Sequence, residues 1–140
     1  KIVFKKKNKS RDITIKEAIG ENKDVVLKID IEGDEYKILK DINRNLDKIN
    51  LVIIEFHTIS KNLKTIKNFI KNTKLKNIHI NANNYGTVDD CGIPQVIEMT
   101  LINPNKFKIK NKKTNRSYPI KGLDFKNHKK GDDIEIIFEK

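Results

Sequence analysis

The chain has 140 residues, of which 36% are hydrophobic and 35% are charged. This length suits one domain with a moderate core, and the apolar runs exclude a wholly disordered chain. The single cysteine, Cys91, excludes an internal disulfide and cysteine-rich zinc sites. No segment has the roughly 18 apolar residues of a membrane span, and no signal peptide is recognisable. We therefore expect a cytoplasmic protein without a membrane span.

The formal net charge is +11, because 30 Lys and Arg residues stand against 19 Asp and Glu residues. Such an excess can attract nucleic acid, anionic glycans or acidic membrane surfaces. The lysines are dispersed among Asn and Ile, however, and the aromatic residues that stack on bases make up only 6% of the chain. We expect no nucleic-acid partner, and polyanion binding is the weakest functional hypothesis.

The first half of the chain alternates between helical and strand patterns. Apolar residues within 13–19, followed by Gly20, predict a short helix with a glycine C-cap. The compact run Asp24–Asp30 (DVVLKID) predicts a buried strand, and an amphipathic helix should follow over residues 32–42. A second almost continuous apolar run, Asn50–Phe56 (NLVIIEF), predicts another buried strand.

The second half contains one more helix and several short strands. Apolar residues at spacings of three and four over 63–70 predict the helix. Residues 81–92 are rich in Asn, Gly and Asp, which is typical of a loop. Strands are predicted at Lys76–Ile80, Val96–Ile102, Phe107–Lys110 and Ile134–Phe138.

Strands that alternate with helices predict βαβ units with right-handed crossovers and a mainly parallel sheet. The closing strands have no helix between them, which predicts an antiparallel C-terminal edge. We therefore predict an α/β fold in a single domain over residues 1–140. Residues 1–12 form its N-terminal edge segment, 13–102 its βα core, and 103–140 its C-terminal strands and loop.

Polar side chains follow three of the predicted strands. In an open α/β sheet the ligand crevice lies beyond the carboxyl ends of the parallel strands, so these side chains should converge. Carboxylates can act as general bases, histidines can move protons, and asparagines can bind hydroxyl groups. The candidate site residues are Asp30, Glu32, Glu55, His57, His79, Asn83 and Asn84.

Each candidate also has a structural interpretation. Acidic residues are favoured at helix N-termini, a histidine after a strand is often a structural residue, and asparagines near a glycine form turns. Hard oxygen ligands with one imidazole suit Mg²⁺ or Mn²⁺, so a metal site is a weaker alternative, and we assign no metal ligand. Its members would be Asp30, Glu32, Glu55 and His57.

Five segments together resemble the FkbM family of methyltransferases. They are LKIDIEGDEYKIL (Leu27–Leu39), LVIIEFH (Leu51–His57), IHINANNYG (Ile78–Gly86), IPQVIEMTLI (Ile93–Ile102) and YPIKGLDF (Tyr118–Phe125). The first is the most specific, because a strand followed by D-x-E-G-x-E and an aliphatic helix is the hallmark of that family. The resemblance extends over most of the chain.

The resemblance implies a Rossmann-like class I methyltransferase that uses S-adenosylmethionine to methylate a hydroxyl of a glycan or natural product. It implies that Asp30 and Glu32 lie near the reacting centre. The residues implied to shape the acceptor pocket are Glu55, His57, His79, Asn83 and Asn84.

Family members carry an upstream glycine-rich turn of the D-x-G-A-N-x-G kind, and none stands before Lys16. We therefore expect the C-terminal part of the domain, with its cofactor-binding residues unassigned. Such a partial sheet would expose one side of the strand at 24–30, which the upstream half, a second copy of the chain, or residues 1–4 would cover. The alternative function is a non-catalytic glycan-binding or assembly module.

Overall fold

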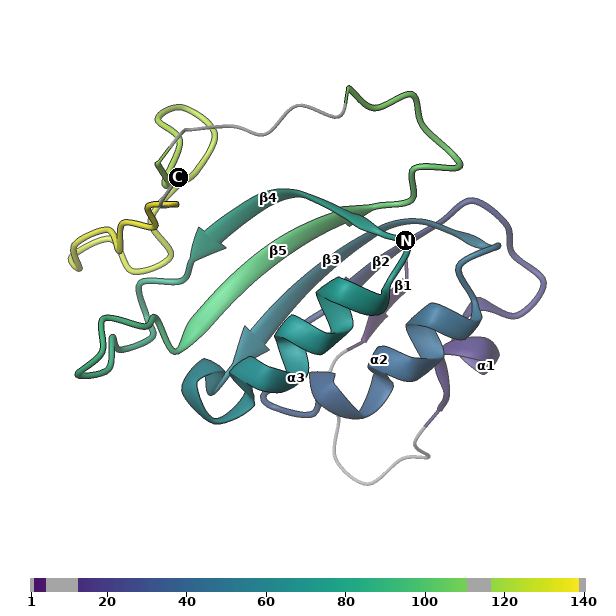
Figure 1. The fold of residues 1–140 in the computed structure, drawn as a ribbon, viewed down its shortest axis with the longest axis horizontal. Helices are drawn as coiled ribbons and strands as arrows, with labels where there is room; N and C mark the ends of the chain where they lie inside the picture. Colours follow the sequence, from purple (N-terminus) through teal and green to yellow (C-terminus); the bar gives the residue numbers. More distant parts are fainter. Residues whose placement is uncertain (1, 5–12, 111–116, 139–140) are drawn as a thin grey trace.

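The structure is a computed structural model and describes residues 2–4, 13–110 and 117–138. These residues form one five-stranded sheet in the order β1-β2-β3-β5-β4, together with three helices (Figure 1). The strands are β1 (Ile2–Phe4), β2 (Val25–Ile29), β3 (Ile49–His57), β4 (Lys76–Ala82) and β5 (Val96–Ile102). The helices are α1 (Ile15–Ile19), α2 (Glu35–Arg44) and α3 (Ile59–Asn72).

The sheet is mixed, so the predicted α/β class is confirmed but the mainly parallel arrangement is not. β2 pairs in parallel with β1 and with β3, whereas β5 pairs antiparallel with both β3 and β4. The cause is the connection between β4 and β5, which is a loop without a helix and returns the chain in the opposite direction. The C-terminal strand β5 is antiparallel as predicted, but it lies inside the sheet, and the edge beside it is β4.

β1 covers the outer edge of β2. Ile2 pairs with Leu27 and Phe4 with Ile29, so the short strand extends the sheet in parallel. Three alternative neighbours were expected for the exposed side of β2, and the structure shows that the N-terminal strand β1 occupies this position. The remainder of the predicted edge segment, residues 5–12, lies outside the described residues.

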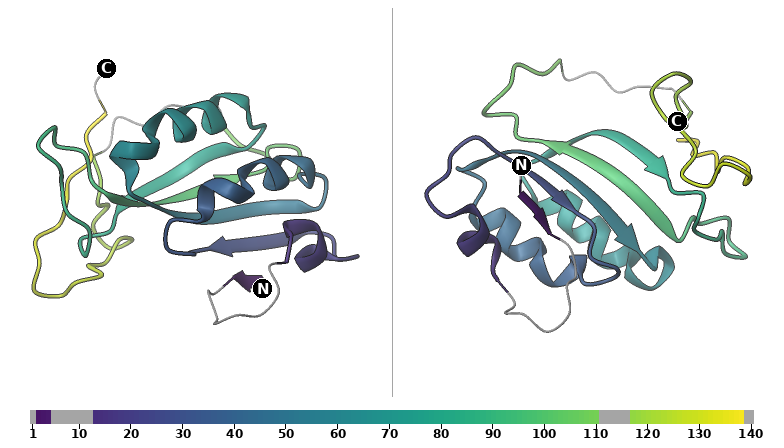
Figure 2. Two further views of the ribbon diagram at one scale, coloured as in Figure 1. Left: turned by 90° about the horizontal axis from the view of Figure 1, so that it is seen from below. Right: turned by 180° about the vertical axis from the view of Figure 1, so that it is seen from behind.

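The helices α2 and α3 pack on one face of the sheet, and α1 contacts α2 beside the β2 edge (Figures 1 and 2). Alternate strand residues face these helices, and Leu27, Ile54 and Phe56 have no exposed surface. Complete burial of such a side chain contributes about 1.5–3 kcal/mol. Gly20 ends α1 at a φ of 55°, as the predicted glycine cap requires.

The opposite face of the sheet carries no helix within the described ranges (Figure 2). Val26 is 41% exposed there, and Lys28 Nζ forms an ion pair with Glu98 Oε2 at 3.0 Å. Because Lys28 stands on β2 and Glu98 on β5, this pair bridges across β3. The face is therefore open to solvent or to a further layer.

The C-terminal segment differs from its prediction. Residues 107–110 form no strand, and within 134–138 only Ile136 makes a bridge, to Tyr118. Both predictions are wrong for the same reason: these short apolar runs find no strand to extend, and Phe107 and Ile137 remain exposed. None of the helices in the described ranges is long and apolar enough to span a membrane.

Candidate active site

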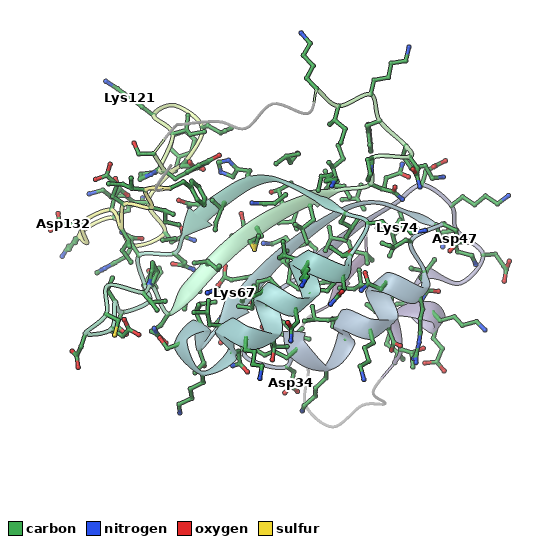
Figure 3. All side chains as sticks on the ribbon, viewed as in Figure 1. Asp34, Asp47, Lys67, Lys74, Lys121 and Asp132 are labelled. Carbon is green, nitrogen blue, oxygen red and sulfur yellow. The ribbon has the colours of Figure 1, made fainter. Side chains whose placement is uncertain are left out.

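A tight turn between β2 and α2 carries Asp30 and Glu32, the first two site residues in the sequence. Glu32 has a φ of 57° and Gly33 a φ of 99°, so two successive residues adopt left-handed conformations. A glycine is favoured at the second position because it has no Cβ to clash. The turn leaves the Glu32 side chain 70% exposed and enters α2 at Asp34, which is labelled in Figure 3.

Glu35, the first residue of α2, is completely buried beneath this turn. Its Oε1 atom accepts hydrogen bonds from the backbone N–H of Ile31 (3.3 Å) and of Gly33 (3.0 Å). The same oxygen lies 2.9 Å from Nδ1 of His57, while Oε2 has no hydrogen-bond partner within the described part of the chain. Glu35 therefore joins the turn to the end of β3.

His57 ends β3 at the centre of the site, with a side chain that is 15% exposed. Because Nδ1 faces the Glu35 carboxyl oxygen, the ring directs Nε2 toward the other acidic residues. Nε2 lies 3.4 Å from Glu55 Oε1 and 3.7 Å from Glu32 Oε2. The backbone oxygen of His57 accepts a hydrogen bond from the Tyr36 hydroxyl, which fixes this strand end against α2.

Glu55 lies two residues before His57 and is slightly better buried, with a side chain that is 12% exposed. Asn83 Nδ2 donates a hydrogen bond to Glu55 Oε1 at 3.2 Å. Burial raises the pKa of Glu55, and the negative charge of Asp30 raises it further, although Asn83 and His57 act in the opposite direction. A carboxyl with a raised pKa holds a proton more readily than a solvent-exposed one.

Asp30, Glu55 and His57 each offer one ligand atom, and these atoms all lie within 4.8 Å of one another. The predicted convergence of side chains beyond β2 and β3 is thus present for these residues, for Glu32 and for Asn83. The group combines acidic oxygens, an imidazole nitrogen and an amide. Such a group can accept a proton, orient a hydroxyl or ligate a cation.

Two other predicted residues lie elsewhere. His79 Nε2 is 2.7 Å from Asp124 Oδ1, and its ring meets Tyr118 edge-on at 5.2 Å. Asn84 accepts from the backbone N–H of His128 at 2.7 Å and donates to the His128 carbonyl at 2.9 Å. Both side chains hold the C-terminal segment to the rest of the fold.

The most important residue missing from the prediction is Glu35. The sequence pattern places it in the first turn of a helix, where an acidic residue usually faces solvent and interacts with the helix dipole. Its burial depends on the path of the preceding turn, which periodicity does not describe. The second glutamate of D-x-E-G-x-E is the only signal that pointed to it.

The comparisons with known proteins give one match, to a family of methyltransferase domains. The sequence profile of the methyltransferase FkbM domain matches residues 7–79, just over half of the 140 residues. No curated protein and no solved structure matches the chain. The matched span includes the turn after β2, the end of β3 and His79.

Proposed function

Because the chain belongs to the methyltransferase FkbM domain family, we propose that it takes part in methyl transfer from S-adenosylmethionine to a hydroxyl oxygen. The acceptor is a glycan or a natural product. The observation that carries the proposal is the convergence of Asp30, Glu55 and His57 beyond the carboxyl ends of two parallel strands, where α/β sheets bind their ligands.

The residues of this chain fit the acceptor better than the methyl donor. S-adenosylmethionine supplies an electrophilic methyl group, and its methionine part needs a glycine-rich turn for close backbone approach. Residues 5–14, between β1 and α1, contain no glycine. We therefore assign no donor contact to this chain and propose that it is the acceptor-binding part of a Rossmann-like domain, in which β2 to β5 are the last strands.

Asp30 and Glu32 are the proposed catalytic residues. Glu32 is the most exposed carboxylate of the group, so its oxygens are accessible to a hydroxyl that enters from solvent. As the hydroxyl oxygen bonds to the methyl carbon, the bond from that carbon to the sulfur of S-adenosylmethionine breaks, and the demethylated thioether leaves. The hydroxyl proton must leave as well, and Glu32 is its proposed acceptor. Asp30 orients the acceptor hydroxyl, which reduces the entropy cost of reaching the reactive geometry.

The remaining predicted residues form the proposed acceptor pocket. Glu55, His57 and Asn83 line its inner wall, and their mutual contacts hold them in fixed orientations. His79 and Asn84 act through the C-terminal segment, which they attach beside β4 as the outer wall. The single cysteine supports a cytoplasmic location for this reaction.

The test is methyl transfer from radiolabelled S-adenosylmethionine to a panel of glycans, with the chain alone and with an FkbM-family segment that carries the glycine-rich turn. Glu32→Gln should abolish transfer while circular dichroism shows an intact fold. Glu21→Gln removes another exposed carboxylate, outside the site, and should leave transfer unchanged. Equal transfer by the two variants would refute the role of Glu32.

The alternative is a non-catalytic glycan-binding or assembly module, in which the same group of side chains would bind a glycan without a methyl donor. Calorimetric titration separates the two functions. A module binds glycans but neither S-adenosylmethionine nor its demethylated product, whereas a methyltransferase domain completed by the glycine-rich segment binds the donor. Binding of a general polyanion has less support, because Lys67, Lys74 and Lys121 lie at widely separated places in Figure 3.

A further inference from the structure

We infer that Asp30, Glu55 and His57 form a binding site for a divalent cation, with Mn²⁺ as the ion that fits best. The inference goes beyond the proposed methyl transfer and does not require it. The three ligand atoms lie within 4.8 Å of one another. Atoms that bind one ion at about 2.1–2.4 Å lie at most about 4.8 Å apart, so a single ion can reach all three after small side-chain adjustments.

Glu35 orients the imidazole as a metal ligand requires. Histidines that bind metals usually direct their second ring nitrogen to a carboxylate or a carbonyl, which fixes the tautomer and increases the basicity of the ligating nitrogen. His57 Nδ1 lies 2.9 Å from Glu35 Oε1, and Glu35 is completely buried. The lone pair on Nε2 therefore faces Glu55, as it must to share an ion with that carboxylate.

The charge of the site also favours a bound cation. Acidic side chains surround a single imidazole in a chain whose net charge is +11, so general composition does not explain their number here. His57 Nε2 lies 3.4 Å from Glu55 Oε1 and 3.7 Å from Glu32 Oε2, so a cation bound among these atoms would be attracted by both acidic side chains. The surrounding acidic side chains are Asp30, Glu32, Glu35 and Glu55.

A buried atom without a partner points in the same direction. Glu35 Oε2 is inaccessible and accepts no hydrogen bond among the described residues, although Oε1 of the same carboxylate lies 2.9 Å from Nδ1 of His57. A buried carboxylate is stable only when positive charge or donors compensate for its lost hydration. Lys28, on the neighbouring strand β2, is engaged by Glu98 at 3.0 Å. An ion on His57 would add positive charge near this carboxylate.

The ligand types select the ion. Carboxylate oxygens suit Mg²⁺, Ca²⁺ and Mn²⁺, whereas imidazole suits the transition metals, and Mn²⁺ accepts both. Three protein ligands leave further coordination positions for water or for an oxygen of a bound molecule. The exposed Glu32, 3.7 Å from Nε2 of His57, lies beside these open positions.

The experiment is a titration of the purified chain with MnCl₂, with no S-adenosylmethionine or acceptor present, in which electron paramagnetic resonance measures free Mn²⁺. We expect saturable binding of one ion. Asp30→Asn, which removes a ligand, should weaken binding at least about tenfold, and Glu35→Gln should weaken it about 10–100-fold by loosening His57. Asp133→Asn removes an exposed carboxylate outside the site and should have no effect.

Circular dichroism of each variant shows whether the fold is retained, and Asp30→Asn keeps the test valid if Glu35→Gln unfolds. Absence of saturable binding by the folded chain would overturn the inference. Equal loss of binding in Asp30→Asn and Asp133→Asn would also overturn it, since binding would then follow net charge alone. Because no donor or acceptor is present, failure here is distinct from failure of the proposed methyl transfer.

Discussion

Replacement of the buried Glu35 by leucine tests whether this residue holds the turn after β2 against the end of β3. Its Oε1 atom faces the backbone N–H groups of Ile31 and Gly33 and Nδ1 of His57, and leucine offers none of them an acceptor. A buried donor without a partner costs about 1–3 kcal/mol. Water can reach part of this turn, so we take the lower limit for each of the three donors.

The loss of about 3 kcal/mol is partly offset, because burial of a carboxyl group is itself unfavourable. We therefore expect Glu35→Leu to lower the free energy of unfolding by about 2–3 kcal/mol, a large share of the 5–15 kcal/mol that is typical of domains. Urea unfolding followed by circular dichroism measures this value at pH 7, and the slope with denaturant should not change.

Glu35→Gln is the matched control, because its side-chain oxygen can still accept from both backbone N–H groups. We expect it to cost less than about 1 kcal/mol in stability. If Glu35→Leu is as stable as the native chain, the hydrogen bonds of Glu35 do not support the turn. If glutamine and leucine destabilise equally, the negative charge and not the hydrogen bonding is responsible.

Three further predictions concern packing, titration and the C-terminal segment. Phe56→Ala should lower the free energy of unfolding by about 3–5 kcal/mol in urea unfolding, because the side chain is completely buried. Hydrogen bonds from the Ser60 hydroxyl and then from the backbone N–H of Ile93 lower the pKa of Asp89. The ionised Asp89 therefore stabilises the fold above its ordinary pKa of 3.8, and this contribution disappears as the pH falls through the lowered pKa. Titration followed by nuclear magnetic resonance should show the lowered pKa of Asp89, and a higher one in Ser60→Ala. Asn84→Ala removes the hydrogen bonds to the His128 backbone and should speed hydrogen exchange over residues 117–138. The control Asn72→Ala, at an exposed position on α3, should leave this exchange unchanged.

Sequence patterns predicted most of the central fold because its strands are nearly continuous apolar runs. The run at 24–30 and the run at 50–56 match β2 and β3 to within one residue at each end, and Val96–Ile102 matches β5. The residues that each strand directs toward α2 and α3 are buried and therefore apolar, whereas apolar residues of the opposite face, such as Val26, stay partly exposed. The exposed runs at 107–110 and 134–138 have similar composition but no neighbouring strand, and composition alone cannot distinguish the two cases.

The site was predictable where it depends on strand ends and unpredictable where it depends on loops. Asp30, Glu55 and His57 converge because β2 and β3 are parallel neighbours, which the βαβ pattern indicates. The position of β5 between β3 and β4 and the contacts of Asn84 depend on the path of the loop over residues 83–95 and of the C-terminal segment. Long-range contacts of this kind leave no periodic signal in the sequence.

The ion pair between Lys28 and Glu98 provides an electrostatic test of the cation site. Glu98 contributes to the raised pKa of Glu55, after burial and Asp30, so its negative charge reaches the site. Lys28→Met would release Glu98 from its partner, and we expect the affinity for Mn²⁺ to rise, whereas Glu98→Gln should lower it.

Both side chains are 36% exposed, so each substitution should change stability by less than about 1 kcal/mol. The difference between the two variants should shrink as salt is raised, because mobile ions screen charges beyond about 10 Å at 0.1 M. If both variants weaken Mn²⁺ binding equally, the sheet face affects the site through its packing and not through its charge.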